Sequence, residues 1–273
     1  MSVLSLFKTS SFAPAFLFLS PKKRKALAAL YAFARAVDDA ADETPDPAAA
    51  RALLDRWRRL LKAPFVPAGE PELPPAWRPL EEAVAAFSVD RRHLLDLIDG
   101  VARDLDGFRA ETAGDFETYC YGVASTVGLA ALAVFGLDEP SHRDFAVPLG
   151  YAVQTVNVIR DVRPDALAGR VYLPREDLRR FGVTEEDLRS ADLRPPVSRL
   201  LRFEASRARE FFSVAHRALP RLSRRAARPA LIMGALYERL LARLEGENFF
   251  WGGPKPRLGF ADKIAAVWMG LTF

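Results

Sequence analysis

The chain has 273 residues, of which 50% are hydrophobic and 27% charged, a composition that excludes wholesale disorder and suits a globular protein with a sizeable core. Its single cysteine, Cys120, and three widely separated histidines exclude a disulfide framework and a helical zinc site. The 39 basic and 35 acidic residues leave a net charge of +4. This charge suits an anionic substrate or a membrane surface, but no nucleic-acid-binding motif accompanies it.

The order of apolar and basic segments predicts a cytoplasmic protein. No continuous apolar run reaches the roughly 18 residues that a membrane-spanning helix needs. The apolar segment 11–19 is followed by a basic cluster, which is the opposite of the order in a signal peptide. Peripheral contact with the inner face of the cell membrane stays open as an alternative.

Helical patterning dominates the first quarter of the chain. Ser20 followed by Pro21 is typical of a helix start, with a capping hydroxyl and proline in the first turn. Apolar residues then recur at steps of three and four between Leu27 and Val37. Thr44-Pro45 ends this helix, and the next is expected over 47–62.

Residues 63–75 contain five prolines and one glycine, which predicts a surface loop within one domain that spans 1–273. After a non-helical stretch at 164–174, Pro174 starts a short helix that ends near Gly182, and Thr184 with Asp187 resembles a capping box. Strand-like alternation is scarce, so the predicted fold class is an all-α helical bundle. Further helices are expected at about 76–87, 90–107, 115–136, 140–163, 197–219, 223–246 and 259–270.

The end of the first helix carries an unusual acidic pair. Asp38 and Asp42 are four residues apart, so they share a helix face with the apolar residues Leu27 and Tyr31. Carboxylates on an inward face at a helix C-terminus are unfavourable without compensation. A hard cation such as Mg²⁺ would compensate them. The alternative is a solvated, acidic helix end.

A second row of oxygen ligands is predicted near residue 160. Asn157, Asp161 and Asp165 follow one another at four-residue steps, and Val153 precedes them on the same helix face. An amide cap with surface acids is the alternative interpretation. Pro164 is expected to end or kink this helix, which would displace Asp165 from the row.

The two rows together are stronger evidence for a ligand site than either row alone. Each has an arginine beside it, Arg35 in the first row and Arg160 in the second. Facing each other across a bundle, they would form a cage for two or three Mg²⁺ ions and a diphosphate. The metals would neutralise a departing diphosphate and so favour ionisation of the C–O bond. Apolar and aromatic walls would shelter the carbocation.

These residues lie in longer motifs that resemble the squalene/phytoene synthase family of head-to-head prenyltransferases. The resemblance runs from about residue 8 to about residue 250. Its anchors are SSFxxAF at 10–16, LYAFxRxVDDxxDE at 30–43, YCYGVASTVG at 119–128, QxxNxxRDVxxDxxxGRVYLPxE at 154–176 and a weaker stretch at 237–249.

The resemblance implies an all-α isoprenoid-synthase fold with a central cavity. It also implies a Mg²⁺-dependent ionisation of one allylic prenyl diphosphate, whose cation attacks the alkene of a second molecule to give a cyclopropyl diphosphate. Carried over residue by residue, it makes Arg35, Arg160 and Tyr119 catalytic, with both arginines on the diphosphate and Tyr119 near the reacting carbons. The implied metal ligands or their supports are Asp38, Asp42, Asn157, Asp161 and Asp165. The implied substrate-binding residues are Ser11, Phe12, Phe16, Val123, Gly128, Gln154, Arg170 and Tyr172.

Several of these residues have a purely structural alternative. Phe12 and Phe16 could be core residues, and Gly128 could serve only close helix packing. Tyr119 could be a core tyrosine with a satisfied hydroxyl, and Arg170 could be a surface residue.

Within the family, residues 10–39 are most similar to bacterial presqualene diphosphate synthases of the hopanoid/squalene route. Such an enzyme joins two farnesyl diphosphates, does not use NADPH and passes its product to downstream squalene-pathway enzymes. Phytoene synthase and dehydrosqualene or squalene synthase remain alternatives from the same family. A terpene cyclase and a non-catalytic helical assembly factor are alternatives of other kinds. The apolar C-terminal segment 264–273 is expected to pack on the bundle or to touch lipid.

Overall fold

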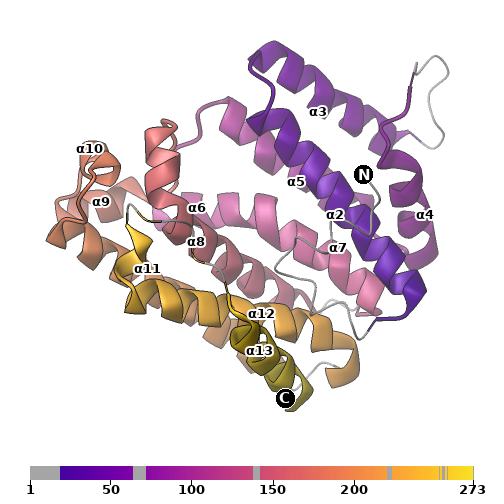
Figure 1. Cartoon of the computed structure of the whole chain (residues 1–273). Coiled ribbons are helices and arrows are strands. Elements are labelled where there is room, and N and C mark those ends of the chain that lie inside the picture. Colours follow the sequence, from indigo (N-terminus) through magenta and orange to yellow (C-terminus); the bar gives the residue numbers. More distant parts are fainter. Residues whose placement is uncertain are drawn as a thin grey trace.

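The computed structural model describes residues 19–63, 72–137, 142–219, 223–251 and 258–272, together with 253 and 256. Across these residues the chain is an all-α bundle without a strand, as predicted (Figure 1). Ser11, Phe12 and Phe16 lie outside the described residues. The helices are α2 (Pro21–Asp42), α3 (Pro47–Lys62), α4 (Trp77–Phe87), α5 (Arg91–Leu105), α6 (Ala113–Cys120), α7 (Thr126–Phe135), α8 (Arg143–Leu167), α9 (Arg175–Phe181), α10 (Glu185–Arg189), α11 (Pro195–Ala218), α12 (Arg224–Gly246) and α13 (Phe260–Thr272).

The sequence signals for helix starts are confirmed at two places. The Ser20 side chain accepts a hydrogen bond from the backbone N–H of Lys23, and Pro21 occupies the first turn of α2. At α10, Thr184 and Asp187 form a reciprocal capping box. In both cases a side-chain oxygen satisfies a backbone N–H that has no partner within the helix.

The helix expected over 115–136 is two α-helices joined by a π-helical turn at Tyr121–Ser125. The whole segment Ala113–Phe135 is long and apolar enough to cross a bilayer by length and mean composition, although Asp115, Glu117 and other polar residues interrupt it, so it is not a continuous apolar run. Figure 1 shows α7 in the middle of the bundle, and it contacts α2, α5, α8 and α12. Packing inside the bundle therefore accounts for its apolar character.

Glycines allow the π-helical turn to approach its neighbours closely. A Cβ added to Gly122 would lie 2.9 Å from the Cα of Gly100 on α5. A Cβ added to Gly150 on α8 would lie 2.5 Å from the Cα of Ser125. Backbone approaches this short leave no room for a methyl group, so both contacts determine where α5 and α8 sit around the turn.

We expect Gly150→Ala to destabilise the protein by about 1–3 kcal/mol, because the added methyl overpacks a rigid backbone contact. The matched control is Gly128→Ala on α7. A Cβ there would meet only the carbonyl oxygen of Ala146, at an ordinary 3.7 Å. Urea unfolding of both variants measures the difference. Equal stabilities for the two variants would contradict the close-contact interpretation.

The expectation that Pro164 ends α8 is wrong, because the helix continues to Leu167. The non-helical stretch therefore begins at 168 rather than 164. Proline removes one backbone hydrogen bond, but Pro164 lies within the last turn of α8. The end is set by Gly169, whose φ of +79° suits glycine at a helix C-terminus. Asp165 thus remains on the helix.

A buried charged cluster joins α11 to α9. Glu204 is fully buried and accepts a 2.5 Å hydrogen bond from Arg207, which also binds Asp177 on α9 at 2.7 Å. Burial raises the pKa of Glu204 to about 8, and Asp177 adds to this shift while Arg207 opposes it. Two carboxylates thus share one guanidinium in the interior, and protonation of Glu204 balances the charge.

We expect Glu204→Gln to remove part of the pH dependence of stability. The folded-state pKa of Glu204 lies above the ordinary value of 4.5, so its contribution is fully present below pH 4.5. That contribution is lost as pH rises to about 8. The variant should therefore gain stability relative to wild type at pH 8 compared with pH 5, measured by urea unfolding. Glu210→Gln, exposed on the same helix, is the control and should show no such gain.

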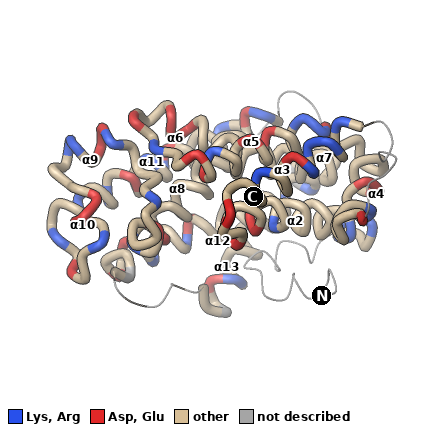
Figure 2. The backbone as a smooth tube through the Cα atoms, turned by 90° about the horizontal axis from the view of Figure 1, so that it is seen from above, with Lys and Arg blue, Asp and Glu red and all other residues tan. Residues whose placement is uncertain are grey.

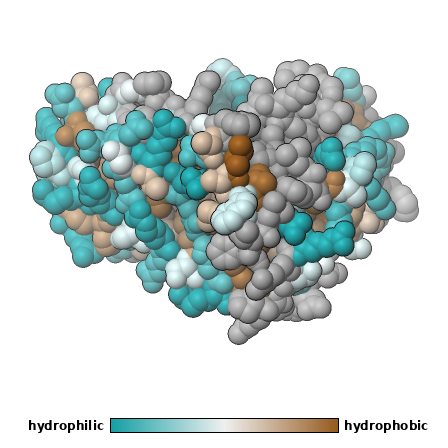
Figure 3. All heavy atoms as spheres, turned by 60° about the horizontal axis from the view of Figure 1, so that its bottom comes forward, coloured by the Kyte–Doolittle hydropathy of each residue, from teal (hydrophilic) through white to brown (hydrophobic). Residues whose placement is uncertain are grey.

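The surface of the bundle is mixed in charge. Figure 2 shows basic and acidic residues interspersed along the helices. In Figure 3, hydrophilic residues cover much of the described part of the lower face, with a small hydrophobic group among them. The C-terminal segment packs on α12 through Ala266 and Gly270, while Ile264 and Trp268 on α13 are 53% and 65% exposed.

Candidate active site

Two cavities of opposite character meet in the middle of the bundle. One is a polar chamber of about 400 Å³ between α2, α5, α6, α8 and the segment after α8, and the other is an apolar chamber of about 300 Å³ bounded by α2, α5, α7, α8 and α12. The polar chamber is lined by Arg35, Asp38, Ala41, Asp42, Val101, Asp104, Tyr119, Val123, Gln154, Asn157, Val158, Arg160, Asp161, Asp165, Arg170 and Tyr172. Four residues line both chambers, namely Asp38, Val123, Gln154 and Asn157. The site can thus hold a ligand with one charged and one apolar end.

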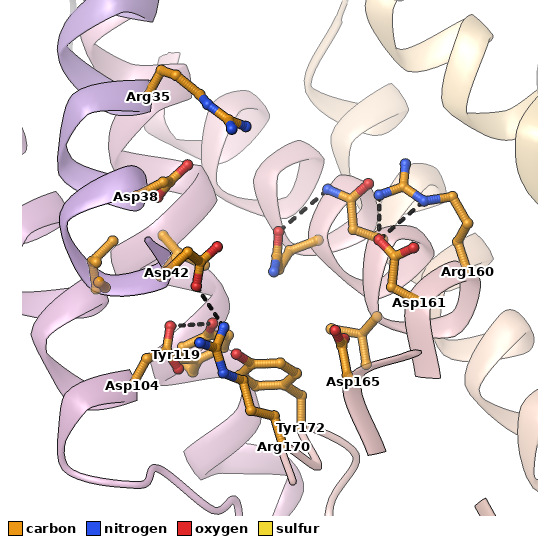
Figure 4. A pocket seen from close by; sticks show the side chains of 16 residues that line it. Arg35, Asp38, Asp42, Asp104, Tyr119, Arg160, Asp161, Asp165, Arg170 and Tyr172 are labelled. Carbon is orange, nitrogen blue, oxygen red and sulfur yellow. Dashed lines mark hydrogen bonds and ion pairs between the residues drawn. The ribbon is translucent and has the colours of Figure 1, made fainter. Parts of the chain in front are cut away.

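The acids of α2 face the polar chamber, as Figure 4 shows for Asp38 and Asp42. Asp38 is open to the chamber, but the protein around it displaces bulk water. This desolvation, followed by the charge of Asp42, raises the pKa of Asp38 to about 7. Arg35 lies one turn earlier, where it pairs with Asp39 at 2.8 Å.

The acids of α8 occupy the opposite side of the same chamber (Figure 4). Arg160 donates to Asp161 from Nε at 3.1 Å and from Nη2 at 2.5 Å. Asn157 lies one turn earlier and accepts a hydrogen bond from Tyr237 at 3.3 Å. Because α8 continues past Pro164, Asp165 also lines the chamber.

The segment after α8 forms part of the chamber wall through Arg170 and Tyr172. Arg170 binds Asp42 across the chamber, with 2.5 Å between Nη1 and Oδ1. This pair links two parts of the chain that are 128 residues apart. The ring of Tyr172 stacks on that of Tyr119 with 5.0 Å between the centroids. Arg170 is therefore part of the chamber wall rather than an isolated surface residue.

The sequence-predicted residues fall into three groups. All five predicted metal ligands, the three arginines and Tyr119, Tyr172, Val123 and Gln154 line the polar chamber. Gly128 lines the apolar chamber, where space rather than close helix packing surrounds it. Ser11, Phe12 and Phe16 lie outside the described residues, so their predicted roles stay predictions.

Sequence reasoning missed Asp104 on α5 and Tyr237 on α12. Asp104 lines the polar chamber and accepts a 3.1 Å hydrogen bond from the Tyr119 hydroxyl. Burial raises its pKa to about 6, against the opposing effect of that hydrogen bond. The sequence does contain a pattern that places Asp104 on the inward face of its helix. Leu97, Val101 and Asp104 follow one another at steps of four and three residues.

The chamber carries an excess of negative charge. Five carboxylates and three guanidinium groups line it, which leaves a difference of two negative charges when all are ionised. Among the residues that the structure describes, no three acidic, histidine or cysteine side chains already converge on one metal position. The acids instead form two separate rows, so any cation would bind between side chains that face each other across a gap.

Comparison with known proteins gives one consistent family. A model described as squalene/phytoene synthase matches residues 8–260. A presqualene diphosphate synthase of Rhodopseudomonas palustris is 33% identical over 94% of the chain and 91% of that enzyme. Phytoene synthase 1 of Arabidopsis thaliana is 32% identical over 92% of the chain, which spans only 60% of the plant protein's length.

Solved structures agree with this assignment. A dehydrosqualene synthase in complex with a ligand has a TM-score of 0.86 and 26% identity, covering 99% of this chain and 94% of its own. A squalene synthase from Alicyclobacillus acidocaldarius has a TM-score of 0.78 and 29% identity, covering 90% and 93%. The likeness therefore extends over the whole bundle that holds the two chambers.

Proposed function

Because the chain belongs to the squalene/phytoene synthase family of head-to-head prenyltransferases, we propose that it condenses two farnesyl diphosphates to presqualene diphosphate and releases diphosphate. The observation that carries this proposal is the junction of the two chambers. A charged chamber and an apolar chamber share Asp38, Val123, Gln154 and Asn157. A prenyl diphosphate has the matching two-part character.

Magnesium fits the donor set of the polar chamber. A diphosphate is itself anionic, so it would be repelled by a chamber with five carboxylates and three guanidinium groups unless cations bind with it. Mg²⁺ prefers carboxylates together with phosphate oxygens. The residues that would hold two or three such ions are Asp38, Asp42, Asn157, Asp161 and Asp165. Bound there, the metal would supply Lewis-acid stabilisation of the leaving diphosphate.

The chain's own residues supply binding, orientation and shelter. Arg35, Arg160 and Arg170 stand around the chamber as donors for the oxygens of the diphosphate. When the C1–O bond breaks, its electron pair leaves with the diphosphate. The allylic C1 cation then gains a bond from the alkene of the second substrate, and loss of a proton closes the cyclopropane ring. The apolar chamber keeps water from the cation throughout.

Similarity to one relative supports the presqualene diphosphate branch. The presqualene diphosphate synthase of Rhodopseudomonas palustris is 33% identical to this chain, and the match covers 94% of this chain and 91% of that enzyme. NADPH is not expected to take part, because the proposed product is the cyclopropyl diphosphate itself.

We expect Asp38→Asn and Asp161→Asn each to lower kcat/KM by about 100-fold or more, because each removes a charge that stabilises the transition state. Both variants should also bind inorganic diphosphate with Mg²⁺ more weakly in calorimetry. Asp144→Asn, exposed near the start of α8, is the control and should retain activity. Circular dichroism should show all three variants folded. Wild-type turnover in both chamber variants would refute the metal assignment.

Product analysis tests the proposed function directly. Purified protein with Mg²⁺ and farnesyl diphosphate should give a C30 cyclopropyl diphosphate in mass spectrometry, in equal yield with and without NADPH. Squalene that requires NADPH would identify a squalene synthase, and a C30 hydrocarbon without NADPH a dehydrosqualene synthase. Turnover of geranylgeranyl diphosphate alone would identify a phytoene synthase, and a cyclic C15 product a terpene cyclase. Absence of any product and of joint Mg²⁺–diphosphate binding would indicate the non-catalytic helical scaffold.

A further inference from the structure

Three aromatic rings form a continuous stack that ends at the polar chamber. The ring of Tyr119 is parallel to that of Phe108, with 4.7 Å between centroids and 12° between planes. Tyr172 stacks on Tyr119 at 5.0 Å and 20°. Two near-parallel neighbours at these distances must cover opposite faces of Tyr119. Phe108 is not part of the chamber wall, whereas Tyr172 is, so Tyr172 is the chamber end of the stack.

This arrangement leaves Tyr119 without a free ring face. Its side chain is buried, with 4% exposure, and only an edge and the hydroxyl remain for other contacts. The hydroxyl donates to Asp104 Oδ2 at 3.1 Å. Burial raises the pKa of the Tyr119 phenol well above its ordinary value, so the hydroxyl keeps its proton and remains the donor.

Asp104 stands at a junction of the chamber wall. It comes from α5, outside both acidic motifs, and its charge also interacts with Arg170 and with the hydroxyl of Tyr172. Arg170 in turn binds Asp42. One carboxylate thus connects α5, α6 and the segment after α8, at the point where the aromatic stack reaches the chamber (Figure 4).

We propose that Asp104 is a positioning residue, which holds the Tyr119 hydroxyl and thereby keeps the outer face of Tyr172 towards the reacting carbons. The inference rests on the proposed function, because it assigns the ring face to the stabilisation of an allylic cation. An aromatic face attracts a cation through the quadrupole of the ring.

Kinetics separate this role from a structural one. Asp104→Ala should lower kcat on the order of tenfold to hundredfold, since small displacements at a reacting centre have effects of this size. KM should change less than kcat, because Arg35 and Arg160 are unchanged and Arg170 keeps its ion pair with Asp42. Prenyl alcohols, formed when water captures the misplaced cation, should rise as a fraction of product. Asp104→Asn should recover most of kcat, because its amide oxygen still accepts from Tyr119.

A double-mutant cycle tests whether Asp104 acts through the hydroxyl of Tyr119. In a Tyr119→Phe background the hydroxyl is absent, so Asp104→Ala should have a much smaller further effect on kcat. The control is Asp99→Ala, exposed on α5 and paired with Arg58, which should leave kcat unchanged. Additive effects of the two changes, or an Asp104→Ala variant that loses only thermal stability, would overturn the proposal.

An independent readout keeps this test separate from the proposed function. Near-ultraviolet circular dichroism reports the ring packing whether or not the protein turns over a prenyl diphosphate. Asp104→Ala should change the tyrosine bands while the far-ultraviolet spectrum stays the same, and Asp104→Asn should restore them. An unchanged near-ultraviolet spectrum in Asp104→Ala would overturn the positioning role. An inactive wild type with the expected spectral change would count against the proposed function alone.

Discussion

The site depends on one electrostatic constraint, which is the placement of two rows of acids on opposite sides of a confined chamber. Asp38 and Asp42 lie in the last two turns of α2, and Asp161 and Asp165 lie in the last two turns of α8, so both rows are near the C-terminal ends of helices, where the helix dipole disfavours negative charge. Desolvation, followed by the charge of Asp42, raises the pKa of Asp38 to about 7. Arg160 and Arg170 offset part of the negative charge of the two rows. Because the carboxylates of the two rows repel one another and repel an anionic ligand, the site favours binding a cation and an anionic ligand together.

The packing around the chamber explains how the two rows are held apart. The π-helical turn between α6 and α7 contacts α5 through Gly122 and Gly100 and contacts α8 through Ser125 and Gly150. These backbone approaches position both helices against one central element. The π-helical turn lies where the two linings meet, because Tyr119 lines the polar chamber, Val123 lines both chambers and Gly128 lines the apolar one. The change from charged to apolar lining thus occurs between the end of α6 and the start of α7.

Much of this structure can be predicted from local sequence signals. The helix starts at Ser20 and Thr184 result from capping chemistry, and the inward direction of Asp38 is indicated by its spacing to Leu27 and Tyr31. The expectation for Pro164 is wrong because a proline in the last turn removes only one hydrogen bond, and Gly169 decides where α8 ends. The π-helical turn was not predicted, because helical periodicity continues through it, and its close backbone contacts with α5 and α8 are visible only in the fold.

The missed residues show a different limit. Asp104 continues an apolar stripe on α5 just as Asp38 does on α2, but it lacks a second acid four residues away that would draw attention to it. Its significance arises only when the fold brings together Tyr119, Tyr172 and Arg170 from distant parts of the chain. Spacing within one helix reveals groups that bind a ligand side by side. Groups that orient one another from different helices become visible only in the folded chamber, and the positioning of a reactive cation depends on groups of this second kind.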